Sequence, residues 1–534
     1  MNENFNTENS NPIENTLNDE KNPYSPIDFQ EKQRDYTNHE SAFAWICLIA
    51  GYVFCRTFPA ITNPLGAFVF TLFLFAFTFA VLIVSEVKFK ISNYITAVSA
   101  LLTSLIPLIS ANSFLSFFAF SYSLATYFYF VYSATGNTLK SGFSNLIIAD
   151  YFKALLVLPF TSIDALFKAM FSGKKFGKQT LKIIAGLFLA VIPTTAVIIL
   201  LSYDSEFSRL LDAIFNFNLA NIFSHIGSLI IGIPIGMYFF GLFVSAVDKK
   251  CKDMLTANSC ENIVKAVRKV PEITAVSATI PLLLVYILFF ISQWQYFISG
   301  FTKKLPENFS YAEYAREGFF QLCIVAIINL IIIASVIAFM KRSGDGKNLL
   351  LKVLSIVFSA FTLILISTAI AKMIMYIDIY GLTQKRVYAT FLMIVLTCIF
   401  VMIILLQFIP KIKIIPISLI IVITLFTTLG LINVDRVIAK YNVDCYLSDK
   451  LATVDVDALD DLGDSAIPEM VRLFYNIKNE AVVGKISQED FNVYSRLNSY
   501  LSDYKTEFKD EDQNIFEFNL PHYLAKRALK NYEK

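Results

Sequence analysis

The chain has 534 residues, of which 56% are hydrophobic and only 16% are charged. An ordinary soluble domain contains about 25% charged residues, so this composition predicts a multi-span membrane protein and excludes most classes of soluble enzyme. The formal net charge of +2 also excludes the strongly basic surface of a typical nucleic-acid-binding protein.

Residues 1–40 are rich in Asn, Glu, Lys and Pro and contain no apolar period. This pattern predicts a disordered cytoplasmic tail. No basic region directly precedes the first apolar block. That block is therefore predicted to be a retained membrane helix rather than a signal peptide.

Residues 41–433 are predicted to form a transmembrane domain. Their apolar residues are gathered into blocks of about 18 or more positions, the length that a helix needs to cross a hydrocarbon layer of roughly 30 Å. The predicted fold is an all-α, polytopic transmembrane bundle of about 11 spans. The blocks are 41–58, 64–84, 93–111, 113–134, 180–203, 219–246, 272–300, 318–340, 349–377, 387–409 and 413–433.

Residues 145–178, between two of these blocks, mix apolar side chains with Asp150, Lys153, Asp164 and Lys168. Such a mixture is typical of amphipathic helices that lie in the inner membrane interface. Two helices packed under the bundle explain the pattern equally well, and a re-entrant hairpin is a third interpretation.

The block 219–246 contains Gly232-x-x-x-Gly236 around Pro234. Small residues allow two membrane helices to approach closely, whereas an unwound helix at this depth can bind a transported substrate. We favour helix packing, because the spacing of the blocks shows no inverted repeat.

Residues 434–534 are predicted to form a small helical region outside the membrane. They carry 19 acidic and 13 basic residues, and apolar positions recur at helical spacing. Asp460, Asp461 and Asp464 match the D-D-x-x-D spacing that gathers magnesium around a diphosphate. Without a second acidic cluster we interpret them as a solvated acidic turn, with Asp464 or Ser465 capping the next helix.

The distribution of Lys and Arg predicts the orientation of the chain. Between the spans, 21 of these residues fall on one side and 7 on the other. Basic loops stay in the cytoplasm, so the N-terminus is predicted to be cytoplasmic and the C-terminus extracytoplasmic, in the plasma membrane.

Sequence motifs for catalysis are absent. The chain has no phosphate-binding G-x-x-x-x-G-K-[ST] loop, no H-E-x-x-H and no G-x-S-x-G, and it has only three histidines. We therefore predict no cofactor, no metal site and no catalytic residue. Lys372 is the ionisable residue that lies clearly inside a span, and it is interpreted as pairing with Glu313 or Glu317 or as a functional site.

Four ordered segments resemble a bacterial family of multi-spanning membrane proteins. They are Tyr311–Phe320 (YAEYAREGFF), Lys372–Arg386 with its YGLTQKR end, Asn433–Asn442 and Leu462–Pro468. The family is catalogued as a domain of unknown function and is common in Gram-positive bacteria. The resemblance covers roughly residues 40–475 and implies an integral plasma-membrane protein without an established activity.

The polar residues of these segments all fall at the outer interface of the predicted topology. They either tie the outer loops and C-terminal helices together or line a pocket for a lipid headgroup or envelope precursor. The candidate cluster is Tyr311, Glu313, Tyr314, Arg316, Glu317, Lys372, Tyr376, Tyr380, Arg386, Asp435 and Arg436.

Three functions remain open from the sequence. The first is a non-catalytic envelope or signalling component that acts through a membrane protein partner. The second is a transporter or lipid-handling protein, for which membrane lipids are the partners. The third is a membrane-embedded transferase.

Overall fold

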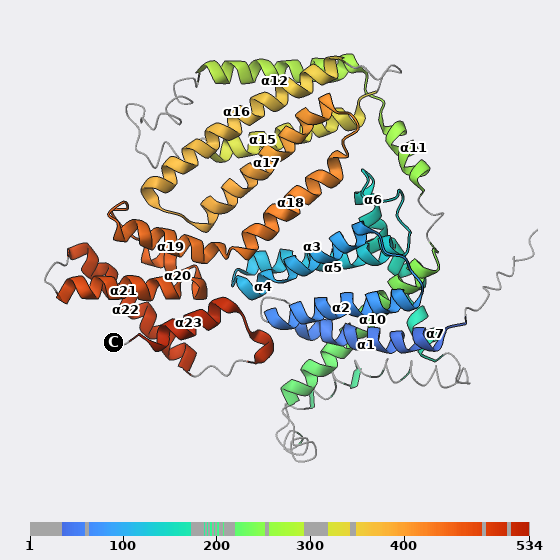
Figure 1. Cartoon of the computed structure of the whole chain (residues 1–534), viewed down its shortest axis with the longest axis horizontal. Helices are drawn as coiled ribbons and strands as arrows, with labels where there is room; N and C mark the ends of the chain where they lie inside the picture. Colours follow the sequence, from blue (N-terminus) through green and yellow to red (C-terminus); the bar gives the residue numbers. More distant parts are fainter. Residues whose placement is uncertain are drawn as a thin grey trace, which may run out of the picture.

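The computed structural model describes most of the chain and is helical throughout the described part (Figure 1). The described residues are 35–58, 63–171, 219–250, 256–292, 319–341, 349–482, 487–509 and 514–532, with single positions between 186 and 207. The predicted N-terminal tail and the predicted span 180–203 lie almost wholly outside them.

Within this described part, 9 helical segments are long and apolar enough to cross a membrane. Each coincides with one of the predicted blocks, which confirms a multi-span helical bundle. They are α2 (Pro64–Val84), α3 (Ile91–Ser104) continued by α4 (Ile106–Ile109), α5 (Ser113–Ala134), α10 (Leu219–Val247), α12 (Glu272–Ser292), α15 (Phe319–Phe339), α16 (Leu349–Tyr380), α17 (Gln384–Phe408) and α18 (Ile414–Leu431).

The first predicted block forms α1 (Asn38–Thr57), which is more polar than these nine segments but runs beside α10. The Tyr52 hydroxyl lies 2.7 Å from His225 Nδ1, and Arg56 Nη1 donates to Ser224 Oγ at 2.7 Å. Farther along, Phe43 contacts Phe243 with ring centroids 4.5 Å apart. The two helices are therefore antiparallel over the length of α1, and α1 accompanies α10 across the bundle.

Glycines set the distance between α1 and α10. A methyl group on Gly51 would overlap the backbone carbonyl of Gly232, and one on Gly236 would lie 2.8 Å from the Cys47 carbonyl oxygen. These backbones touch because both helices lack side chains at the crossing. The Gly232-x-x-x-Gly236 pattern therefore packs α10 against α1, which is the interpretation that the sequence favoured.

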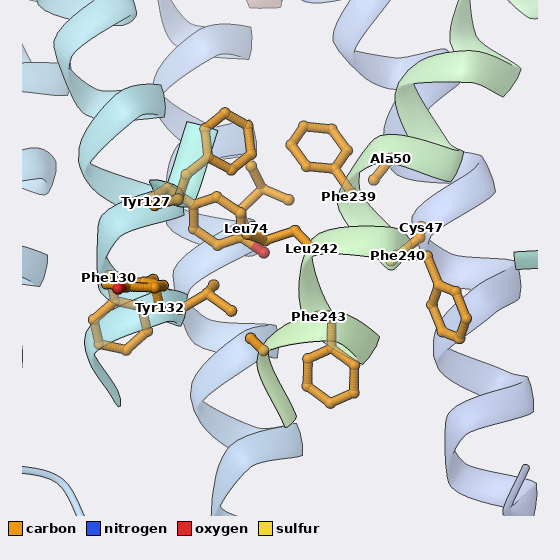
Figure 2. Close-up of a cluster of buried hydrophobic side chains, with 14 of the residues drawn as sticks. Cys47, Ala50, Leu74, Tyr127, Phe130, Tyr132, Phe239, Phe240, Leu242 and Phe243 are labelled. Carbon is orange, nitrogen blue, oxygen red and sulfur yellow. The ribbon is translucent and has the colours of Figure 1, made fainter. Parts of the chain in front are cut away.

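Aromatic side chains fill the core of the amino-terminal lobe, which we define as the described helices between Asn38 and Val247. Figure 2 shows Phe239 and Leu242 of α10 directed toward Tyr127 of α5, whereas Phe240 lies on the side toward Cys47 of α1. The Tyr127 hydroxyl is satisfied inside this core by Thr78 at 2.8 Å.

A second lobe, the carboxy-terminal lobe, consists of α12, α15, α16 and α17 and has a separate apolar core. A buried polar network lies among its spans: the Tyr286 hydroxyl donates to Asn329 Oδ1, and Asn329 Nδ2 donates to Thr362 Oγ1 at 2.9 Å. Hydrogen bonds of this kind hold membrane helices together.

Helix α18 connects the two lobes. Its Ile414 packs against the core of the carboxy-terminal lobe, and Ile415 packs against that of the amino-terminal lobe. At the other end of the helix, Thr427 Oγ1 lies 3.0 Å from Thr103 Oγ1 of α3, and Gly430 admits the side chain of Ile106.

The segment 147–170 folds against the amino-terminal lobe. It comprises α6 (Ile147–Phe152), a π-helical turn η1 (Lys153–Val157), a 3-10 turn η2 (Leu158–Ser162) beginning near Pro159, and α7 (Ala165–Met170). The Tyr238 hydroxyl of α10 donates to the Leu155 carbonyl, and Thr161 donates to Ser245 at 2.7 Å. The opposite face exposes Ile148, Phe152, Leu156 and Phe160.

The C-terminal helices form one domain around a common apolar core. They are α19 (Val434–Leu447), α20 (Val456–Asp460), η3 (Gly463–Ser465), α21 (Ile467–Val482), α22 (Gln488–Lys509), η4 (Ile515–Glu517) and α23 (Leu520–Lys530). We call this group the C-terminal domain. Figure 1 shows it at one end of the bundle, beside the α16–α17 connection and α4.

The opposite end of the bundle gathers lysines, and we call it the lysine end. Contacts between distant segments join its loops: Lys90 Nζ donates to Ser141 Oγ at 3.1 Å, Lys140 pairs with Glu261 of α11 (Ala257–Val267) at 2.6 Å, and Lys413 Nζ donates to the Phe143 carbonyl at 2.8 Å. The loops that the sequence assigns to one side of the membrane therefore lie together.

Candidate functional site

The candidate site begins at a tight turn between α18 and α19. Asn433 adopts a left-handed conformation with φ 54°, and its side chain accepts a hydrogen bond from the Arg436 amide at 3.2 Å. An N-cap of this kind starts a helix in a new direction. The turn places Asp435 in the first turn of α19, directed into the protein.

Asp435 lies at the junction of the two lobes and the C-terminal domain. Its Oδ2 accepts from Asn112 Nδ2, at the α4–α5 turn, at 3.2 Å, and its Oδ1 accepts from Gln384 Nε2, at the start of α17, at 2.8 Å. Only 2% of Asp435 is exposed. Burial raises the pKa of its carboxyl group above the usual value, although the two amide hydrogen bonds oppose this shift.

A second cluster surrounds Arg386, in the first turn of α17. The guanidinium lies 4.2 Å from the centre of the Tyr376 ring, and Nη1 donates to the carbonyls of Tyr380 and Gly381. The rings of Tyr376 and Tyr380 are themselves 5.1 Å apart. Arg386 thus caps the C-terminal end of α16, where the carbonyl groups attract a positive charge.

Asn442 of α19 fastens the C-terminal domain to the α16–α17 turn. Its Oδ1 accepts from the Leu382 amide at 2.7 Å, and its Nδ2 donates to the Leu382 carbonyl at 2.8 Å. Gly381, with φ 73°, allows Asn442 to approach the α16–α17 turn this closely, because a side chain at position 381 would overlap Asn442.

Replacing Asn442 with Ala is expected to lower the free energy of unfolding by about 1–3 kcal/mol, because the partly buried Leu382 backbone groups lose both partners. Thermal unfolding of the purified full chain in detergent measures the change. Asn476→Ala is the matched control, since Asn476 is exposed and bonds only within its own helix. Equal melting temperatures for the two variants would contradict the proposed fastening.

The predicted cluster divides into three groups. Tyr311, Glu313, Tyr314, Arg316 and Glu317 lie outside the described residues, as does any pairing of Glu313 or Glu317 with Lys372. Among the others, the structure brings Tyr376, Tyr380 and Arg386 into direct contact.

Lys372, Asp435 and Arg436 form the third group of the predicted cluster. The Lys372 side chain is buried in α16, one turn before Tyr376. Asp435 forms the junction described above, and the neighbouring Arg436 is exposed on the other side of α19. Adjacent helical residues point in different directions, so the two cannot act as a pair.

The acidic run after α19 holds the C-terminal domain together. Asp457 pairs with Arg496 and accepts from the Tyr500 hydroxyl, Asp460 accepts from the Tyr504 hydroxyl at 2.9 Å, and Asp464 lies 2.9 Å from His522 Nδ1. Asp455 is the N-cap of α20 and accepts from Ala458 N at 3.1 Å. The sequence had assigned a capping role to Asp464 or Ser465; Asp464 instead binds α23, because that helix folds back over η3.

The arrangement is suited to holding helices rather than to chemistry. A carboxylate bound by two amides has partners that neither take nor give a proton, which differs from a nucleophile-base or acid-base pair. In the described part of the chain no group of three His, Cys, Asp or Glu side chains could hold a metal ion.

Sequence reasoning missed the partners of Asp435. Asn112 lies between the predicted blocks 93–111 and 113–134, and Gln384 lies inside the YGLTQKR segment; neither belongs to the candidate cluster. The available signal was their common position at predicted span ends on one side of the membrane. That signal does not distinguish them from other polar residues at the same ends.

The family described as a domain of unknown function, DUF4153, matches residues 97–473, more than half of the chain. The match ends close to the predicted limit near 475 but begins later than residue 40. It includes the described junction residues Asn112, Gln384, Asp435 and Asn442. Comparisons with curated proteins and with solved structures give no match.

Proposed function

This chain belongs to the DUF4153 family, and on that premise we propose that it is a non-catalytic plasma-membrane component that acts through a protein partner. The C-terminal domain is the proposed partner-binding part, outside the cell. The lysine end is proposed to face the cytoplasm, in accordance with the preference of basic loops for that side.

The observation that carries this proposal is the attachment of the C-terminal domain to both lobes. Asp435 joins its first helix to α5 and α17, and Asn442 joins the same helix to the α16–α17 turn. In addition, Leu382, Val387 and Leu429 at the span ends pack against the core of the domain. A partner that moves the domain would therefore move helices of both lobes.

The domain also presents surface for a partner. Phe491 of α22 is 54% exposed and Val482, at the end of α21, is 83% exposed, whereas the acidic residues Asp457 and Asp464 are engaged between helices. Aromatic side chains such as Phe491 are enriched in protein–protein contact surfaces.

Photo-crosslinking in native membranes tests the proposal. A photoreactive amino acid at position 491 is expected to give one discrete protein adduct on the full-length chain. The same group at position 102, where Leu102 is exposed on α3, is the control and is expected to give no discrete protein adduct. Mass spectrometry of the purified adducts identifies the partner.

Two results would contradict the proposal. One is a discrete adduct from position 102 but none from position 491. The other is purified protein that converts or transports a labelled lipid by itself, with that activity lost in a Lys372→Leu variant that melts at the wild-type temperature. The second result would favour the lipid-handling or transporter function.

A further inference from the structure

A cavity of about 330 Å³ opens at the lysine end of the amino-terminal lobe. It lies between the α2–α3 connection, the end of α5 and the end of α10. Its polar lining includes Lys88, Lys90, Asn93, Ser133, Thr135 and Lys249. Ligand sites commonly have volumes of about 300–1,000 Å³, so the cavity can hold a small polar group such as a lipid headgroup.

The wall of this cavity carries an excess of positive charge. Lys88, Lys90 and Lys249 line it, whereas the acidic neighbours Glu86 and Asp248 do not. Within the described residues, no ion pair involves Lys88 or Lys249. Three helix C-termini nearby contribute only about half a negative charge each, and the N-terminus of α3 offsets part of that. The three ammonium groups therefore dominate.

Hydrogen bonds fix several polar residues of the cavity lining. Asn93 is only 2% exposed; its Oδ1 accepts from the Lys90 amide at 2.9 Å, and its Nδ2 donates to Ser133 Oγ at 2.8 Å. Thr135 Oγ1 donates to the Val131 carbonyl at 2.8 Å and accepts from Asn137 Nδ2 at 2.8 Å. These hydrogen bonds hold Asn93, Thr135 and the backbone of Lys90 in place, which lowers the entropy cost of ordering a bound anion.

An exposed apolar stripe continues from the cavity along α3. Ile91, Ile95, Val98 and Leu102 recur at helical spacing, and Ile91 is 79% exposed. This stripe begins beside Lys90 and follows a membrane span, so it lies where acyl chains pack. Basic pockets between span ends are a recurrent setting for anionic headgroups.

We propose that this cavity binds the phosphate group of an anionic ligand, with Lys88, Lys90 and Lys249 as the charged contacts. The apolar stripe favours a phospholipid as the source of that group. The site is separate from the C-terminal domain and does not depend on the proposed protein partner.

Lipid titration of the purified, delipidated full chain in neutral detergent tests this site. The probes are phosphatidylglycerol, phosphatidylcholine with the same acyl chains, and inorganic phosphate alone, with native mass spectrometry and thermal unfolding as readouts. Phosphatidylglycerol is expected to bind more tightly than phosphatidylcholine. Lys88→Gln and Lys249→Gln are each expected to weaken its binding about fivefold, and the double variant about 25-fold.

Lys250→Gln is the matched control, because it removes the same charge one residue from Lys249 at a position that does not line the cavity. It is expected to change the affinity less than about twofold. An equal loss of affinity with Lys250→Gln would show that diffuse surface charge, not this cavity, binds the lipid, and would overturn the proposal. Equal binding of the two lipids together with no effect of inorganic phosphate would also overturn it.

The titration with inorganic phosphate distinguishes a soluble phosphate-containing ligand from a phospholipid. Stabilisation by phosphate alone, lost in the Lys88→Gln/Lys249→Gln variant, would support the phosphate site and assign it to a soluble ligand. Selective binding of phosphatidylglycerol without an effect of phosphate would assign it to a lipid. Wild-type protein that binds neither phosphatidylglycerol nor inorganic phosphate would overturn the proposal.

Discussion

Replacing Gly51 with Ala is expected to destabilise the protein by about 3 kcal/mol, because the new methyl group would overlap the Gly232 carbonyl of α10. The neighbouring atoms are backbone, so no side-chain rotation can relieve the overlap and α1 must move away from α10. The expected result is a lower melting temperature in detergent. The buried Cys47 thiol, on the same face of α1, should also react with a thiol-specific dye at a lower temperature.

Gly227→Ala is the matched control for this prediction, since a methyl group at Gly227 meets no atom within 4 Å. Ala favours a helix over Gly by up to about 1 kcal/mol, so the control is expected to leave stability unchanged or to raise it. A loss of stability in Gly51→Ala together with unchanged or higher stability in Gly227→Ala would show that the close contact at the α1–α10 crossing is what excludes a side chain. A Gly51→Ala protein as stable as Gly227→Ala would show that the crossing does not limit stability.

Replacing Asp435 with Ala is expected to lower the free energy of unfolding by about 2–5 kcal/mol, because the Asn112 and Gln384 amides would both lose a buried acceptor. The measured effect is a lower melting temperature of the full chain. Asp461→Ala is the control, since Asp461 is exposed in the same domain, and it is expected to change stability by less than about 0.5 kcal/mol. Similar melting of the two variants would contradict the role of the junction.

Asp435 also makes stability depend on pH. Its pKa is raised in the folded protein, chiefly by burial, so the folded state binds this proton more tightly than the unfolded chain. The resulting stabilisation is complete below the unperturbed value of 3.8 and is lost as the pH rises through the raised pKa. Wild type is therefore expected to gain stability relative to Asp435→Asn between about pH 7 and about pH 4. A difference that is independent of pH would contradict the raised pKa.

The sequence predicted the spans because their signal is local. A helix that crosses hydrocarbon needs a continuous apolar stretch, and each of the nine span-length segments, such as α5 and α17, carries its own. The lysine-rich loops were recognised for the same reason, and the contacts of Lys90, Lys140 and Lys413 place these loops at one end.

The candidate site was predictable only in part. Tyr376, Tyr380 and Arg386 lie close in sequence on either side of one short turn, so their contact follows from the connection between α16 and α17. Asp435 was selected as an outer-interface residue, but its partners Asn112 and Gln384 are 323 and 51 positions away. No local pattern relates these positions to one another.

Hydrophobicity and charge act over a single helix or loop, so the amino-acid sequence was enough to establish the multi-span helical class of this protein. The tertiary structure decided which span ends meet: the glycine crossing of α1 and α10, the lysine-lined cavity, and the buried junction at Asp435. These features depend on the angles and depths at which helices pack, since a polar side chain at a span end finds its partner only after separate helices have assembled.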